Sequence, residues 1–449
     1  MPSDGMALLP NNSKSTETDS AFINLPFTHR AAGPLDTGVK MSEPLTYSTL
    51  VAACTPGGAS VMTMRTELAP AAGQEAGIAP ARYVRGNNAT YAFETRFATD
   101  PETDRAEAVK TVVIDSKGSS LNRVEQELSL AIRDGDPLIS LTPRIQVTYG
   151  GEEPVTCLDL PHRAFDGHIR AGTVAGNAVT DHPTYRAARD STPANARALL
   201  ELSPIGLVMG AWDSTRRSHQ VRLRSALVGE TIGILADQSA DATRIAPRGA
   251  ARRDEIAPSV RLGAKEMTAL LEAQEAELSL SNVESVRKAI SKAGKGTTSG
   301  SALVLGSIPP SLEGLGFVSC RRILRTTVLS FSALRQLRFG LGSDGDAAVR
   351  VLLASLALAG VARSYAELSF RANCDLVEID EPTCELDARY GKKIRLTIPD
   401  IGSADDLLRQ AISEVVSRGI RWEGQVFEVV GNPIIAGGII AEADGDRSS

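Results

Sequence analysis

The sequence predicts an α+β fold, and three observations carry that prediction. Stretches with strand-like alternation and stretches with helical periodicity follow one another without the regular repeat of a doubly wound sheet. Hydrophobic residues make up 42% of the 449 residues and aromatic residues only 4%, so Leu, Val, Ile and Ala must fill the core. A chain of this length forms two or three compact units, or one core that carries long insertions.

The individual elements are placed by residue pattern and by turn signals. We expect strands at 47–54, 60–68, 89–97, 111–114, 221–235 and 392–400, and a loop-rich region with several prolines that includes 143–151. We expect helices at 122–132, 266–280, 347–365 and 403–419, and a strand followed by a helix over 321–340. Ser403 is a candidate N-cap for the helix that follows it.

Composition divides the chain further. Residues 1–45 are rich in Ser, Thr, Asn and Pro without periodicity, which is typical of a flexible arm. Residues 238–300 begin with a charged stretch, continue as a helix and end in AGKGTTSGS, so we interpret them as a charged helical insertion. The tail 436–449 is polar, and we expect it to be free.

Several classes of protein are disfavoured by the residue counts. Five cysteines are scattered without a CxxC pair, which favours reduced thiols over disulfides or a zinc site: Cys54, Cys157, Cys320, Cys374 and Cys384. The five histidines form no HExxH motif, so we expect neither a metal nor a cofactor. No apolar run approaches the roughly 20 residues that span a bilayer, and the first residues lack a signal-peptide pattern. We therefore expect a cytoplasmic protein with no membrane partner.

Two catalytic interpretations fail on their spacing. AGKGTTSG resembles a phosphate-binding loop, but Ala289 replaces the first glycine of that motif, and Gly296 follows Lys295 where a hydroxyl is needed. SPIGLVMG lacks the glycines of a nucleophile elbow around Ser203. His162 lies near two aspartates, but spacing alone places no catalytic triad, so a structural or ligand-contacting role fits it better.

Basic residues are concentrated although the net charge is −6, with 48 basic and 54 acidic residues. Two stretches hold nine arginines and no acid: Arg216, Arg217, Arg222 and Arg224 in the first, and Arg321, Arg322, Arg325, Arg335 and Arg338 in the second. A globally acidic molecule can still carry a basic groove, and arginine suits phosphate geometry. Solvated faces explain the same pattern.

The stretch IDSKGSSLNRVEQEL raises a related question, because an apolar run stops at Asp115 and a helix starts soon afterwards. Lys117, the serine hydroxyls and the backbone N–H groups then lie at the N-terminus of that helix. A helix N-terminus carries a partial positive charge and unpaired donors, which together attract anions. A serine that merely caps the helix explains the stretch equally well.

Several segments together resemble the backbone subunit of type I-G (formerly type I-U) CRISPR Cascade complexes, a Csb-type member of the RAMP superfamily. The segments that carry the resemblance occur in the family's order: DSKGSSLNRVEQEL, LDLPHRAFDGHIR, LELSPIGLVMGAWDS, RSALVGETIG, GSIPPSL, TTVLSFSALRQLRF and RSYAELSFRANCDLV. They cover most of residues 60–380. The resemblance implies an RRM-like (ferredoxin-type) palm with inserted finger and thumb elements, built from residues 46–237 and 301–435.

The resemblance also implies a function in antiviral defence. Such subunits are not enzymes; they stack head to tail as a filament along CRISPR RNA and hold the guide for pairing with target DNA. Their partners include further copies, a large subunit and a Cas5/Cas6-type fusion subunit. Relatives carry a Lys-Arg pair at the helix after the polar turn, whereas this sequence has Asn122-Arg123, so one expected charge is absent.

We therefore expect RNA-binding residues and no catalytic or metal-binding residue. The predicted contacts are Lys117, Ser119, Ser120, Asn122, Arg123, His162, Arg163, Arg216, Arg217, Arg222, Arg224, Arg335 and Arg338. Arg335 and Arg338, three residues apart, are expected on one helix face, and Trp212 is either a base-stacking or a core residue.

Two other functions remain open. Relatives in type III complexes cut RNA with a loop aspartate. One alternative is therefore a metal-dependent endoribonuclease that uses Asp115 or Asp213. The position of Asp115 directly before a helix start is also typical of a turn residue. A protein-only scaffold is the other, in which basic clusters meet acidic partners. The acidic residues 375–387 would suit head-to-tail stacking of acidic on basic faces between neighbouring subunits.

Overall fold

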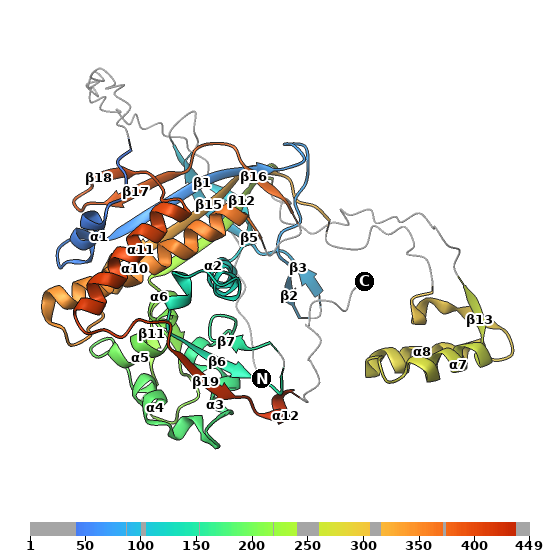
Figure 1. The fold of residues 1–449 in the computed structure, drawn as a ribbon. Coiled ribbons are helices and arrows are strands. Elements are labelled where there is room, and N and C mark those ends of the chain that lie inside the picture. The colour runs from blue at the N-terminus through green and yellow to red at the C-terminus, as the bar shows by residue number, and fades with distance from the viewer. Residues whose placement is uncertain are drawn as a thin grey trace, which may run out of the picture. The chain divides into compact units, whose positions relative to one another are not determined.

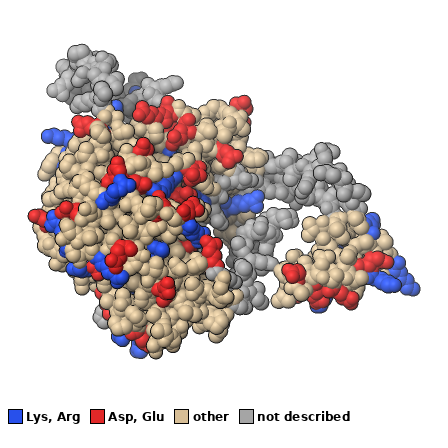
Figure 2. All heavy atoms as spheres, viewed as in Figure 1, with Lys and Arg blue, Asp and Glu red and all other residues tan. Residues whose placement is uncertain are grey.

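We describe a computed structural model of the chain over residues 42–86, 88–99, 105–151, 153–218, 220–239, 260–305, 316–370 and 374–436. Helices and antiparallel strands are mixed in it, which confirms the α+β prediction (Figure 1). Charged side chains of both signs are interspersed on the face shown in Figure 2. The expected arm and tail lie almost wholly outside the described residues.

The largest sheet is antiparallel and has eight strands. Seven of them follow the order β18-β17-β1-β15-β12-β5-β4, and β16 also pairs with β1. Their bounds are β1 Val61–Pro70, β4 Phe93–Thr99, β5 Ala106–Asp115, β12 Leu227–Leu235, β15 Cys320–Ser330, β16 Leu376–Glu378, β17 Thr383–Asp387 and β18 Lys393–Leu396. In β1, alternate residues Met62, Met64 and Thr66 are buried, so this strand turns one side to the core.

Helices cover that side of the sheet (Figure 1). They are α1 Tyr47–Cys54, α2 Lys117–Arg133, α9 Phe331–Leu334, α10 Gly342–Glu367 and α11 Ile401–Ser417. The sequence of α10 is apolar on all sides, and residues 345–363 of it are all buried, as expected for a central core helix. An 18-residue window of α10 is long and apolar enough to cross a membrane, and all of that window is buried inside the protein.

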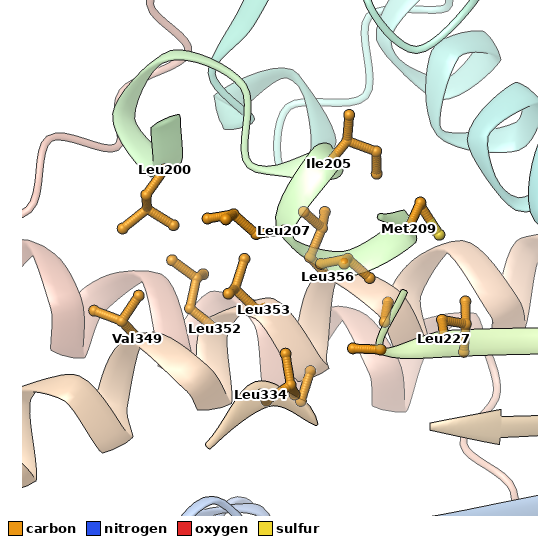
Figure 3. Packing of buried hydrophobic residues seen from close by; sticks show 14 of the residues in the cluster. Leu200, Ile205, Leu207, Met209, Leu227, Leu334, Val349, Leu352, Leu353 and Leu356 are labelled. Carbon is orange, nitrogen blue, oxygen red and sulfur yellow. The ribbon is translucent and has the colours of Figure 1, made fainter. Parts of the chain in front are cut away.

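Figure 3 shows how α10 packs against α6 Ile205–Met209. Leu352, Leu353 and Leu356 of α10 lie beside Leu207 and its neighbours, and these residues belong to one hydrophobic cluster. The glycine at position 360 allows α2 to approach α10 closely, because a Cβ there would lie 2.6 Å from Val124 Cγ1.

A second sheet has five strands in the order β7-β6-β19-β8-β9. They are β6 Arg144–Thr148, β7 Val155–Thr156, β8 Thr173–Val174, β9 Asn177–Ala178 and β19 Val426–Val430, and β6 runs parallel to β19. The short helices α3 Gly167–Arg170, α4 Pro183–Arg189, α5 Arg197–Leu202 and α12 Pro433–Ala436 belong to the same part of the chain. Two further two-stranded hairpins lie outside these sheets. One pairs β10 Ala211–Trp212 with β11 Arg222–Leu223, and the other pairs β2 Tyr83–Arg85 with β3 Asn88–Thr90.

Residues 260–305 form a small unit with its own core. Two helices, α7 Ala264–Gln274 and α8 Leu280–Ala293, pack with the hairpin of β13 Arg261–Gly263 and β14 Thr297–Ser299. Met267, Leu271, Val283 and Val286 are buried between them. The helical character predicted for this tract is confirmed, whereas part of AGKGTTSGS is strand and not loop.

Three local predictions are wrong. Residues 47–54 form α1 and not a strand, because Leu50, Ala53 and Cys54 have helical spacing and all three are buried. The N-cap of α11 is Asp400, whose Oδ1 accepts the Ser403 amide at 2.8 Å, so Ser403 is inside the helix. The helix after β15 ends at Leu334, and therefore Arg335 and Arg338 do not share a helix face.

Candidate nucleic-acid interface

The polar turn predicted to bind phosphate is the start of α2. Ser116 is its N-cap, and its Oγ accepts the Ser119 amide at 3.3 Å. Lys117 and Asn122 are exposed on the outside of the helix, whereas Ser119 and Ser120 are half-buried. The Ser120 side chain packs against β12, because a Cβ added at Gly229 would lie 2.5 Å from its Oγ. Capping is therefore Ser116's role, and Lys117 is the charge at this end that faces solvent.

Arg123 lies one turn into α2 and is half-buried. Its Nη1 donates to Gln126 Oε1 at 3.3 Å, while its Nε is buried and has no partner within the described chain. It lines a cavity of about 20 Å³ with Ser120, Thr231 and Arg325. Since that volume suits roughly one water molecule, the cavity itself does not admit a phosphate.

Arg163 connects α2 to the β10–β11 hairpin. Its guanidinium contacts both Glu125 oxygens at 2.5 and 2.7 Å and donates to the Gly210 carbonyl, next to β10, at 3.0 Å. Burial raises the pKa of Glu125, and the ion pair with Arg163 opposes that rise. His162 beside it is exposed, and its amide donates to Asp166 at 3.2 Å. The Arg163 side chain thus fixes the hairpin relative to α2.

The β10–β11 hairpin carries the first arginine cluster. Trp212 is 52% exposed, so the core interpretation of this residue is wrong, and the guanidinium carbon of Arg222 lies 5.3 Å from its ring centre. Arg217 and Arg224 are exposed and make no hydrogen bond or ion pair within the described chain. Arg216 instead pairs with Asp190 at 2.8 Å and donates to the Arg189 carbonyl.

An open hollow of about 530 Å³ lies beside this hairpin. Arg216 and Arg222 line it together with Asp190, Thr192, Pro193, Gln220 and Val221. Arg222 thus lies both beside the Trp212 indole and on the wall of the hollow, which combines an aromatic ring, cations and a hollow at this hairpin. These are the components with which proteins bind single-stranded nucleic acid.

Several arginines of the second cluster bond groups inside the protein and are not available to a ligand. Arg335 Nη1 donates to the carbonyls of Ala53 and Ala59 at 2.5 and 2.7 Å, and burial lowers its pKa. Arg325 is 6% exposed, stacks 3.6 Å from the Tyr365 ring centre and pairs with Glu378. Arg338 is exposed, although its Nη1 also donates to the carbonyls of Arg335 and Leu337. Of the predicted pair, Arg338 is the one that solvent reaches.

The two aspartates offered for a nuclease are buried. Asp213 is 1% exposed, and its Oδ2 accepts two bonds from Arg189 at 2.7 and 2.9 Å. Asp115 is 3% exposed at the end of β5. Within the described part of the chain, no cluster of three His, Cys, Asp or Glu side chains has the arrangement of a metal site.

Sequence reasoning overlooked another basic surface, the hairpin between β17 and β18. Its residues ARYGKKIR include Arg389, Lys392, Lys393 and Arg395, and Tyr390 among them is 96% exposed. The signal was present as an aromatic residue inside a basic run. The acidic residues 375–387 lie directly before this basic run, so the sign of the charge changes within one hairpin.

Comparison with known proteins gives one finding. Residues 62–238 match the family described as CRISPR-associated protein GSU0053 (Cas_GSU0053). Over these residues, which include α2 and the β10–β11 hairpin, the chain is similar to a CRISPR-associated protein. No curated protein matches the chain. The matched residues include the first arginine cluster but not the second.

Proposed function

We propose that this protein is a non-catalytic, CRISPR RNA-binding backbone subunit of a type I-G Cascade complex in the cytoplasm. Copies of it would polymerise head to tail along the guide, beside a large subunit and a Cas5/Cas6-type fusion subunit, and present the guide to target DNA. The family match over residues 62–238 supports a CRISPR-associated role of this kind.

The arrangement of the main sheet supports a RAMP-type palm. In a ferredoxin-like βαββαβ unit, the first strand lies between the third and the fourth, and the second lies beside the third. β1, β12, β15 and β17 have this order, with α2 and α10 at the two helix positions in the chain. The hairpin of β4 and β5 precedes α2 and extends the sheet beyond β12.

The observation that carries the proposal is the exposed surface of the β10–β11 hairpin. Arg217 and Arg224 have no hydrogen-bond or ion-pair partner among the residues that the structure describes, and Trp212 offers a ring face of the kind on which bases stack. Exposed cations without acidic partners hold phosphates without reading sequence, as a guide-binding subunit must do. Lys117 at the start of α2 would add to this surface, because Arg163 links α2 to the hairpin.

The endoribonuclease alternative has weaker support. The Arg189 guanidinium compensates the charge of Asp213, and burial keeps that carboxylate away from solvent. A scaffold without RNA would leave the exposed arginines unexplained, although it would tolerate them as a solvated face.

The test begins with protein purified from cells that carry a CRISPR array. We expect a high ratio of absorbance at 260 and 280 nm and extracted RNA of one discrete length. RNA of mixed lengths would argue against a guide-bound subunit, and protein without nucleic acid at low salt would favour the scaffold.

Single variants then locate the surface. Arg217→Ala and Arg224→Ala should each lower the salt slope of single-stranded RNA binding by about 0.7, as expected for one lost phosphate contact. Arg409→Ala is the matched control, because Arg409 is an exposed arginine on α11 that pairs with Asp406 at 2.5 Å. If all three variants bind alike, the β10–β11 hairpin is not the RNA surface.

A further inference from the structure

The tip of the β17–β18 hairpin has an unusual backbone for its residues. Arg389, Tyr390 and Gly391 have φ angles of 72°, 54° and 77°, all in the left-handed region. Lys392 N donates to the Arg389 carbonyl at 3.0 Å, so Tyr390 and Gly391 are the central pair of a tight turn. A turn in which both central residues have positive φ normally takes Asn, Asp or Gly at the first of them. Tyrosine is a strained choice there.

Within the described residues, no packing contact compensates for the strain at Tyr390. Tyr390 is 96% exposed, the largest exposed fraction among the large hydrophobic side chains of the described chain. A bulky residue in a strained conformation with no packing partner conflicts with local stability, and such conflicts concentrate at functional sites.

The turn is held firmly in place. Asp387 accepts the Arg389 amide at 3.0 Å and the Ser60 hydroxyl, and its carbonyl accepts the Ser60 amide at 3.1 Å. Ala388 N also donates to the Lys392 carbonyl at 2.9 Å. The Ser60 hydroxyl, which is the larger cause, and the Arg389 amide lower the pKa of the Asp387 carboxyl. The carboxylate therefore stays charged at neutral pH and keeps the turn formed. The aromatic ring is therefore presented on a preorganised support.

Cations flank Tyr390 in the sequence. Arg389, Lys392, Lys393 and Arg395 are all exposed, and only Lys393 pairs with a carboxylate, Glu385 at 2.6 Å. Burial is the largest cause of the lowered pKa of Arg335, and the charge of Arg389 lowers it further by a smaller amount. The support of the turn is close to Arg335, because Ser60 bonds Asp387 and the neighbouring Ala59 carbonyl accepts from Arg335.

We propose that the tip of the β17–β18 hairpin is a second contact for single-stranded nucleic acid, in which a base stacks on Tyr390 and Arg389 and Lys392 hold the flanking phosphates. An exposed aromatic ring with exposed cations beside it in the chain supplies the base stacking and the phosphate attraction on which such binding depends. This inference rests on the proposed function, and it adds residues outside the matched range 62–238.

Protection of a sheet edge explains only part of these observations. β18 is an edge strand, and lysines on an edge discourage pairing with other chains. That role accounts for Lys393 and Arg395 on the strand. It does not account for an exposed tyrosine at a position of the turn that prefers asparagine.

The experiment compares three variants of the full chain in binding to a fluorescent single-stranded oligonucleotide, made as RNA and as DNA. Tyr390→Ala should weaken binding by about 5- to 150-fold, the range for one stacked base, while Tyr390→Phe should bind as the wild type does. Tyr390→Asn should also weaken binding, yet unfold at the same or a higher temperature, because asparagine suits the turn. Phe97→Ala is the matched control, an aromatic residue 80% exposed on β4.

Abasic strands separate stacking from charge. On a strand without bases, Tyr390→Ala should bind as the wild type does, whereas Arg389→Ala should still lower the salt slope. A loss confined to RNA would identify the guide as the occupant, a loss confined to DNA would identify a DNA strand, and an equal loss would mean that the sugar is not read.

Other results would overturn the inference in recognisable ways. If the wild type binds RNA and Tyr390→Ala binds equally well, the hairpin contact is wrong and the proposed function stands. If Phe97→Ala loses as much affinity as Tyr390→Ala, no specific stack exists at the tip. If the wild type binds no single strand at all, both the contact and the proposed function fail.

Discussion

At the scale of single residues, arginines that look alike in the sequence have different tasks in the structure. Arg216 pairs with Asp190 and donates to the Arg189 carbonyl, whereas the next residue, Arg217, is exposed and has no partner in the described part of the chain. Arg335 supports the carbonyls of Ala53 and Ala59, while Arg338 reaches solvent. A guanidinium can stabilise a fold or bind a phosphate, and only its neighbours decide which.

Arg163 provides a test of this distinction. Arg163→Ala leaves Glu125 buried without its cation, so we expect the free energy of unfolding to fall by about 3 kcal/mol in urea titrations. The double variant Arg163→Ala with Glu125→Ala removes the stranded charge and should recover part of that loss. Arg163→Ala that folds with unchanged stability but binds RNA weakly would mean instead that Arg163 contacts RNA directly.

At the scale of elements, the position of α2 is determined by what it packs against. Its hydrophobic side, with Val124 and Leu128, lies on α10 at Gly360, and Ser120 lies over Gly229 of β12. Two glycines therefore allow the helix to approach both of its supports. Lys117 and Asn122 at the start of α2 are exposed, because they lie away from the side of the helix that packs on α10 and β12.

Gly360→Ala tests the seating. The added methyl group would lie 2.6 Å from Val124 Cγ1 and 3.1 Å from Leu128 Cδ1, and a β-branched neighbour cannot move away easily. We expect a loss of about 1–3 kcal/mol in the free energy of unfolding. Gly118→Ala is the matched control, because a Cβ added at this position would have nothing within 4 Å. This change should be neutral or stabilising by up to ~1 kcal/mol. Equal effects of the two changes would contradict the close approach of α2 and α10.

At the scale of the whole molecule, the proposed function requires repetition along RNA. The β10–β11 hairpin and the β17–β18 hairpin lie on separate parts of the chain, one next to α6 and the other at the edge of the main sheet. Two separate contacts on one subunit suit a strand that passes over an extended surface.

A filament makes a quantitative prediction. The number of protein copies bound, measured by native mass spectrometry, should increase in proportion to the length of the RNA, because each copy covers a fixed number of nucleotides. An oligonucleotide of double length should therefore carry about twice as many copies. One copy per strand at every length would contradict polymerisation while leaving RNA binding intact.

The sequence by itself determined the fold class and most of the regular elements. Alternation predicted β1, the apolar run before Asp115 predicted the end of β5, and the apolar stretch 347–365 predicted α10. These succeed because burial of one side of a strand, or of all sides of a helix, leaves a period in the residues themselves. The resemblance to Cascade backbone subunits likewise came from the order of segments in the chain, and the family match supports a CRISPR-associated protein.

Only the tertiary structure decided which polar residues are available to a ligand. Arg163 contacts Glu125, and Arg335 contacts Ala53, although the partners are far apart in the chain. No local sequence pattern predicts either contact. Tyr390 shows the converse, because its exposure and positive φ belong to a turn that closes only when β17 and β18 pair. Periodicity reports burial along one element, whereas the partners of a charged group depend on chain segments that folding brings together.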